Sequence, residues 1–194
     1  MMDELVKTLR HFITRDLIFL VGGGSVVASF VYTFGLPPTS KDPVVLYLLV
    51  VGISYVLGYA LQDASGLLHV LPTTAPRKLN RYQRWFYKCY TREPWQDIPG
   101  TTNFQRAEEG LQHGRQIAWL ERITSLRQVC TTVAPCWVVS AGLLGIRRWQ
   151  KGGQDFDLPA AFAGLCIAVV LGHLAWVKAA QEAQYLHEHP PRSV

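Results

Sequence analysis

Charged residues are scarce in this chain and unevenly placed. Lysine, arginine, aspartate and glutamate make up 17% of the 194 residues, whereas 49% are hydrophobic. Four windows of about twenty residues, close to the length of a membrane-spanning helix, contain no acidic or basic side chain at all. A soluble domain of this size rarely needs four such windows. The scarcity of charge therefore argues against an ordinary soluble globular protein.

Patterns typical of catalysis and of cofactor binding are also lacking. The sequence has no HExxH, no paired HxxxH box, no glycine-rich phosphate-binding loop and no GxSxG elbow. Its four cysteines, Cys89, Cys130, Cys136 and Cys166, form no CxxC pair, and the last three fall in the uncharged windows. We therefore expect no disulfide framework, no enzymatic activity, no catalytic residue, no cofactor and no metal ion.

The four uncharged windows predict an all-α fold with four transmembrane helices in a bundle. Only a helix satisfies its own backbone inside lipid, and the windows lack the alternation of a β-barrel. The predicted spans are residues 17–35, 44–62, 128–146 and 158–177. They form two hairpins, within residues 1–71 and 128–194, on either side of a loop over 72–127. The first window lacks a cleavage pattern, so we interpret it as a retained span.

The distribution of positive charge predicts the orientation of the spans. The loop over 72–127 carries ten lysines and arginines against five acidic residues. If this loop and both termini are cytoplasmic, fifteen of the nineteen lysines and arginines lie inside, as the positive-inside rule requires. The four cations left outside are Lys41, Arg147, Arg148 and Lys151. We expect a multi-pass protein of the inner (plasma) membrane with cytoplasmic N- and C-termini.

Three segments outside the spans carry helical patterns. Residues 1–16 alternate cations with apolar side chains, which is typical of an amphipathic surface helix. Residues 80–90 interleave cations with aromatics, which suits anionic lipid headgroups and, less well beside a span, nucleic acid. A capping-box pattern precedes a helix over 103–127 that continues into span three, where Pro135 should produce a kink. The expected lipid-interface residues are Arg81, Arg84, Trp85, Phe86 and Lys88. After span four we expect a short cytoplasmic tail.

Small residues four apart occur in every predicted span and indicate close helix packing. The expected packing residues are Gly22, Gly23, Gly24, Ala28, Ser54, Gly58, Ala141, Gly145, Ala168 and Gly172. Span one, with three consecutive glycines, predicts an unusually close contact, either within the chain or between two copies of it. Glycine and alanine are common in all spans, so a single pair is weak evidence, but the whole set favours a homo-oligomer.

Two functional hypotheses follow from these patterns. The first is a non-enzymatic membrane protein that self-associates and couples a soluble cytoplasmic partner or signal to the membrane, as a channel-like effector or sensor. Its size and architecture suit a bacterial stress or phage-defence system.

The second hypothesis is a small transporter or inner-leaflet enzyme that uses Asp63, His69, His113 and His173. Clustering of these side chains around a cavity would favour it. The simpler interpretation is that Asp63 marks the border with water and that His173 is a packed interfacial histidine.

Overall fold

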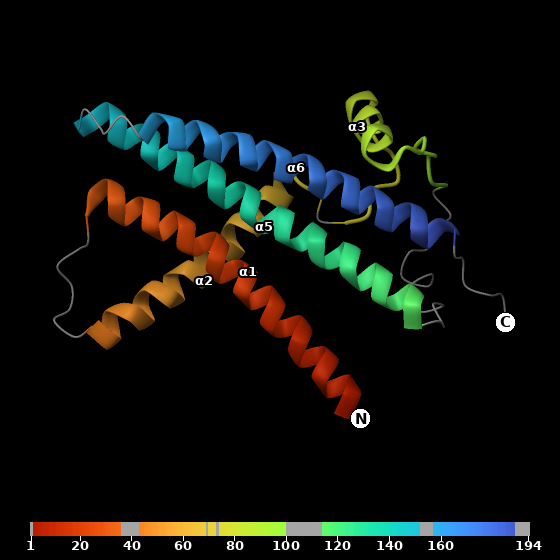
Figure 1. The fold of residues 1–194 in the computed structure, drawn as a ribbon, viewed down its shortest axis with the longest axis horizontal. Coiled ribbons are helices and arrows are strands. Elements are labelled where there is room, and N and C mark those ends of the chain that lie inside the picture. Colours follow the sequence, from red (N-terminus) through yellow and green to blue (C-terminus); the bar gives the residue numbers. More distant parts are fainter. Residues whose placement is uncertain are drawn as a thin grey trace.

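The fold is known from a computed structural model that describes residues 2–35, 43–68, 70–72, 74–99, 114–151 and 157–188. These ranges contain five helices and no strand, so the predicted all-α class is confirmed for them (Figure 1). The helices are α1 (Met2–Phe34), α2 (Pro43–Leu67), α3 (Arg81–Thr91), α5 (Gly114–Lys151) and α6 (Asp157–Glu188). All but α3 are long and apolar enough to cross a membrane, and they contain the four predicted spans except for Gly35 at the end of the first.

The long helices pack as two crossing layers (Figure 1). Helices α5 and α6 run side by side as an antiparallel pair with the largest contact in the molecule. Helix α1 packs on α5 and on α2, and α2 crosses α1 at an angle to reach α5. Helix α3 packs on α6 alone among the described helices, on the side of α6 away from α1. The end of α1 and the start of α6 lie together, whereas the end of α6 lies at the opposite end of the molecule.

All four long helices extend beyond the predicted spans, and α2 does so as far as Leu67. Helix α1 joins the expected surface helix and span one in a single element. Helix α5 runs unbroken from Gly114 and includes Pro135, although residues 103–113 of the helix expected there lie outside the described ranges. Helix α6 continues to Glu188, about three turns beyond the expected end of span four at Val177. Where a short tail was expected, the chain is therefore helical as far as Glu188.

The extension of α6 is stabilised by α5, which runs beside it. Arg127 and Glu182, both largely buried, form an ion pair with 2.7 Å between Nη1 and Oε2, although their angle falls outside hydrogen-bonding geometry. Further along, the rings of Trp119 and Tyr185 lie 4.3 Å apart between centroids. The Arg127–Glu182 ion pair and the Trp119–Tyr185 ring contact thus join α5 and α6 beyond the uncharged segments of the two helices.

The close contact predicted for span one is made within the chain. A Cβ atom on Gly23 would lie under 3.0 Å from backbone atoms of Ser54 and Gly58, and one on Gly58 would approach the backbone of Phe19 as closely. Only glycine allows the two backbones to cross at this distance. The ring of Phe19 closes the crossing with edge-on contacts to Tyr55 and Tyr59.

The other expected packing residues divide into two groups. Those that are buried or packed against another part of the chain are Gly22, Gly24, Ala141, Ala168 and Gly172. Ala28 is exposed, and a Cβ on Gly145 would meet nothing within 4 Å. These two positions lie on open faces of α1 and α5.

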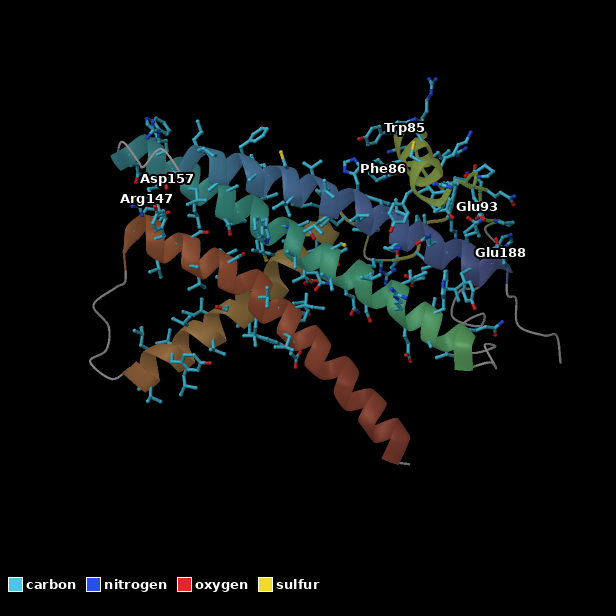
Figure 2. The ribbon with its side chains drawn as sticks, viewed as in Figure 1. Trp85, Phe86, Glu93, Arg147, Asp157 and Glu188 are labelled. Carbon is cyan, nitrogen blue, oxygen red and sulfur yellow. The ribbon has the colours of Figure 1, made fainter. Side chains whose placement is uncertain are left out.

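Arg147 and Asp157 lie together at one end of the molecule (Figure 2). With Tyr32 they form a polar cluster that joins α1, α5 and α6. The guanidinium of Arg147 lies 3.5 Å from the ring centroid of Tyr32 and donates to the Tyr32 carbonyl. Its Nε is 3.5 Å from Asp157, which is fully buried, and the Tyr32 hydroxyl donates to the same carboxylate at 3.1 Å. One of the cations counted against the predicted orientation is therefore paired with an acid.

Candidate functional site

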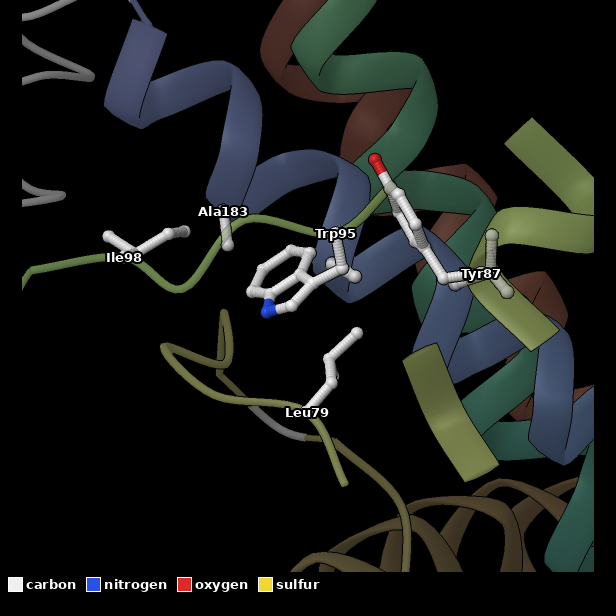
Figure 3. Close-up of a cluster of buried hydrophobic side chains, with 7 residues drawn as sticks. Leu79, Tyr87, Trp95, Ile98 and Ala183 are labelled. Atoms are coloured by element: carbon white, nitrogen blue, oxygen red, sulfur yellow. The ribbon is translucent and has the colours of Figure 1, made fainter. Parts of the chain in front are cut away.

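Residues 75–98, here called the docked unit, form a small folded structure on α6. Four of its large side chains, Leu79, Tyr87, Trp95 and Ile98, are buried in one cluster (Figure 3). Helix α6 contributes the small residues Val177, Ala180 and Ala183 to the same cluster. Because alanine projects only a methyl group, the aromatic rings of the docked unit lie directly against the surface of α6.

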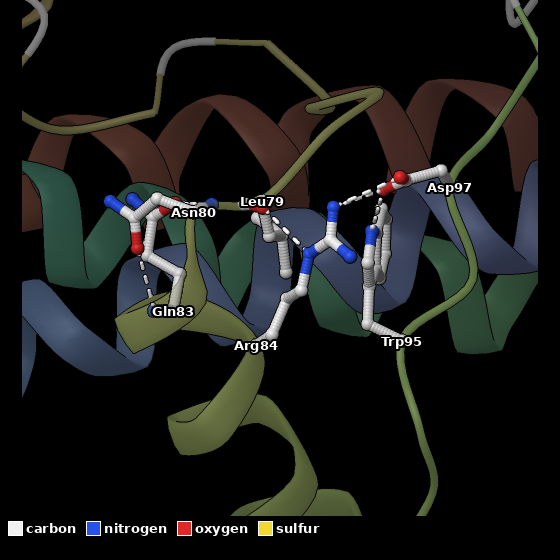
Figure 4. Close-up of polar contacts among 6 residues, drawn as sticks. All are labelled: Leu79, Asn80, Gln83, Arg84, Trp95 and Asp97. Atoms are coloured by element: carbon white, nitrogen blue, oxygen red, sulfur yellow. Dashed lines mark hydrogen bonds and ion pairs between the residues drawn. The ribbon is translucent and has the colours of Figure 1, made fainter.

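The start of α3 is fixed by a capping box. The Asn80 side chain accepts a hydrogen bond from the backbone of Gln83 at 2.8 Å, and the Gln83 side chain accepts one from the backbone of Asn80 at 3.0 Å (Figure 4). At the other end, Arg92 adopts the left-handed conformation with φ of 64° and its N–H donates to the Lys88 carbonyl. Residues next to α3 thus provide hydrogen-bond partners for backbone groups at both of its ends.

Arg84 holds the two halves of the docked unit together (Figure 4). Its Nε donates to the Leu79 carbonyl at 2.8 Å, and its Nη2 contacts both oxygens of Asp97 at 2.9 Å. Asp97 also accepts a hydrogen bond from the indole of Trp95 at 3.0 Å. This network sets Trp95 against α6.

Tyr87 connects α3 to α6 through its hydroxyl, which donates to Gln184 at 2.6 Å. Burial raises the pKa of Tyr87 from 10.0 to about 12, and the negative charge of Glu93 adds to this shift. The phenol therefore stays protonated at physiological pH and remains a donor.

The expected lipid-interface residues have two different environments. Arg81, Trp85 and Lys88 are exposed on the outer side of α3. Arg84 is bound to Asp97, and the Phe86 ring is half-buried with its centroid 4.6 Å from that of His173. The alternation of cations and aromatics does not distinguish these environments, because both occur on the same short helix.

A groove of about 560 Å³ lies between α3 and the long helices. Residues of α5 and α6 form its two long walls. The third side comes from α2 and the chain just after it, through Leu61, Ala64, Ser65, Leu68, Val70 and Leu71. Tyr82, Gln83 and Phe86 of α3 border it. Most of these side chains are apolar, and the volume is typical of a small-ligand site.

His173 is the polar residue of α6 at this groove. Its Nδ1 is 2.7 Å from the Val169 carbonyl, and its Nε2 is 2.9 Å from the Tyr82 hydroxyl. A carbonyl oxygen can only accept, so Nδ1 donates to Val169, and Nε2 is the ring nitrogen that pairs with the Tyr82 hydroxyl. One turn on, Trp176 donates to the Val70 carbonyl at 3.2 Å. The groove is thus bordered by hydrogen bonds from α6 to α3 and to the chain after α2.

The four residues of the transporter or enzyme hypothesis are not assembled by the described structure. Asp63 is exposed on α2 and does not line the groove that His173 lines. His69 and His113 lie outside the described residues. Within the described part of the chain, no three histidine, cysteine, aspartate or glutamate side chains are placed to hold a metal ion.

Hydroxyl groups inside the bundle pair with one another and with the helix backbone. Thr132 donates to Gln62 at 3.1 Å and lies 2.9 Å from the Gln128 carbonyl, and Ser140 contacts Ser25 at 3.4 Å. These contacts join α5 to α2 and to α1. A comparison of the chain with protein-family models, with curated proteins and with solved structures gives no match.

Proposed function

We propose that this chain is a multi-pass membrane protein that couples a soluble partner or signal at its inner face to its four spans, without an enzymatic step. The observation that carries the proposal is the seating of the docked unit on α6. The same helix that receives Trp95 and Tyr87 continues as one of the long apolar helices. A shift of the docked unit therefore acts directly on a span.

The charge distribution supports an inner-face position for the docked unit. Residues 72–127 are rich in cations, and such loops remain on the cytoplasmic side. The exposed Arg81 and Lys88 of α3 suit either anionic headgroups or an acidic surface on a soluble protein. The end of α6, the helix on which this unit packs, would then be an inner end.

The contacts inside the bundle favour a relay of movement over a pore through one chain. The hydroxyls of Thr132, Ser140 and Ser25 are engaged with neighbours instead of lining an open path. The glycine contact of α1 is used within the chain, so a homo-oligomer would have to form through other faces of the spans.

Hydrogen exchange of the protein in lipid nanodiscs tests the coupling. We expect Trp95→Ala to release the docked unit and to raise exchange in α6 on both sides of Val177, including the part within the predicted span. Trp149→Ala is the matched control, because Trp149 is 90% exposed at the other end of the bundle. If exchange changes only within residues 75–98, the docked unit and the spans are not coupled.

A further inference from the structure

We propose that the groove beside α3 holds one acyl chain of an anionic membrane phospholipid, with the headgroup next to α3. The proposal rests on the membrane insertion put forward above. It adds a ligand and a site to that function.

The groove opens onto the apolar surface of the molecule. Three of its lining residues, Leu68, Val138 and Val169, are between 49% and 74% exposed. Its two long walls belong to α5 and α6, inside the parts that are apolar enough to lie in a membrane. If these helices span a bilayer, the medium next to the groove is hydrocarbon, and lipid chains are its most abundant component.

The volume of the groove favours a thin, flexible occupant. A helix of about 10 Å diameter rises about 5.4 Å per turn, so about 560 Å³ would be filled by fewer than two of its turns. A span of a second copy would therefore rest on the groove without entering it. An acyl chain can follow the space between α5 and α6.

The polar side of the groove lies at α3. Asn80, Tyr82 and Gln83 border the groove there, together with His173, and none of the described lining residues is acidic. The exposed Arg81 lies between Asn80 and Tyr82, and Lys88 follows on the same short helix. This combination of hydrogen-bonding groups and cations complements an anionic phosphate-containing headgroup.

Two glycines give a matched pair of variants for the test. A Cβ on Gly172 would meet only the side chain of Leu71, at 3.5 Å, so a larger side chain can enter the groove there. A Cβ on Gly52 would meet nothing within 4 Å, and Gly52 does not line the groove. Gly172→Leu fills the groove, and Gly52→Leu adds the same side chain elsewhere.

The measurement is native mass spectrometry of protein released from nanodiscs made of equal parts phosphatidylglycerol and phosphatidylcholine. We expect the wild type and Gly52→Leu to retain one phospholipid per chain, and Gly172→Leu to retain at least about tenfold less. Equal retention by the two variants, or no lipid retained by the wild type, would overturn the proposal.

The headgroup is tested on the same samples with Arg81→Gln, and with Arg122→Gln as a control on the exposed surface of α5. We expect the ratio of bound phosphatidylglycerol to phosphatidylcholine to fall about fivefold for Arg81→Gln, the effect of one cation near the headgroups, and to stay unchanged for Arg122→Gln. An unchanged ratio in Arg81→Gln would refute the headgroup position.

Alkaline carbonate extraction of cell membranes separates failure of this proposal from failure of the proposed function. If carbonate extracts the wild type from the membrane, the proposed function and the lipid site are both refuted. If the wild type stays in the membrane and Gly172→Leu retains as much lipid as the wild type, only the proposal that the groove holds an acyl chain is refuted.

Discussion

Asp157 is fully buried at the start of α6, and its carboxylate is held by Arg147 and the Tyr32 hydroxyl. Replacing it with asparagine removes the charge but keeps the shape, which leaves Arg147 without its opposite charge. We expect Asp157→Asn to lower the free energy of unfolding by about 1–3 kcal/mol. Denaturant unfolding in detergent micelles measures the loss.

The control for this variant is Asp63→Asn on the exposed surface of α2. We expect it to change the free energy of unfolding by less than about 0.5 kcal/mol, as is usual for exposed positions. Similar losses in the two variants would mean that the cluster at Asp157 adds nothing to the stability of the bundle.

The raised pKa of Tyr87 predicts how the docked unit responds to alkaline pH. Burial favours the protonated phenol in the folded state, with a pKa of about 12 against 10.0 when exposed. The contribution of Tyr87 to docking is therefore complete below pH 10 and is lost as the pH rises towards 12. The difference in tyrosinate absorbance between wild type and Tyr87→Phe should follow Tyr87 alone and have its midpoint near pH 12. A midpoint at pH 10 would contradict the buried position.

Among the elements, the crossing of α1 and α2 depends most strictly on residue size. A Cβ on Gly23 would overlap the backbone of Ser54, which cannot move away as a flexible side chain can. We expect Gly23→Ala to lower the free energy of unfolding by about 1–3 kcal/mol and to separate the two helices. Thermal unfolding in detergent, combined with a disulfide cross-link between α1 and α2, measures both effects.

Gly52→Ala is the counterpart on the same pair of helices. Its new methyl group meets nothing, and alanine is the better helix former, so we expect no loss or a gain of up to about 1 kcal/mol. If Gly23→Ala is as well tolerated as Gly52→Ala, the close crossing of α1 and α2 is wrong.

The sequence predicts the existence of the long helices better than their ends. Each apolar window is a local pattern, so its position can be read without knowing the fold. The end of α6 depends instead on α5: Lys178 and Glu182 suggest a transition to water, but Glu182 is paired with Arg127 and the helix continues. Arg127 and Glu182 are far apart in the chain, so no local sequence pattern predicts that they form an ion pair.

The candidate site was only partly predictable for the same reason. The basic and aromatic character of α3 is evident in the sequence, and so is the unusual position of His173. The contact of His173 with Tyr82, the Arg84–Asp97 network and the groove all require the docked unit to fold back on α6. That fold-back rests on alanines of α6, which look like ordinary span residues in the sequence.

At the scale of the whole molecule, the four native cysteines allow the orientation of the chain in the membrane to be tested without introducing new ones. Cys89 is exposed on α3, Cys166 is exposed in the apolar part of α6, and Cys130 and Cys136 are buried. A charged maleimide that cannot cross the membrane should label no cysteine in intact spheroplasts. In inverted membrane vesicles it should label Cys89 alone. Thiols within lipid form little of the reactive thiolate, so they should stay unlabelled.

Cys89→Ser is the control and should abolish this labelling. Labelling of Cys89 in intact spheroplasts would reverse the orientation derived from the positive charges. Strong labelling of Cys166 would instead place α6 outside the membrane.

Helices α5 and α6 are much longer than a bilayer is thick. Their 38 and 32 residues correspond to about 57 Å and about 48 Å, whereas the hydrocarbon core measures about 30 Å. In the membrane orientation proposed above, the cluster at Asp157 would fix the outer end, and the excess length would project at the inner end as a lever arm of roughly 20 Å. A change in tilt of about 10°, small against the range seen for spans, would swing the tip of this arm by about 3–4 Å. In that orientation, a small change in the tilt of α5 and α6 would displace their inner ends by about the length of a side chain.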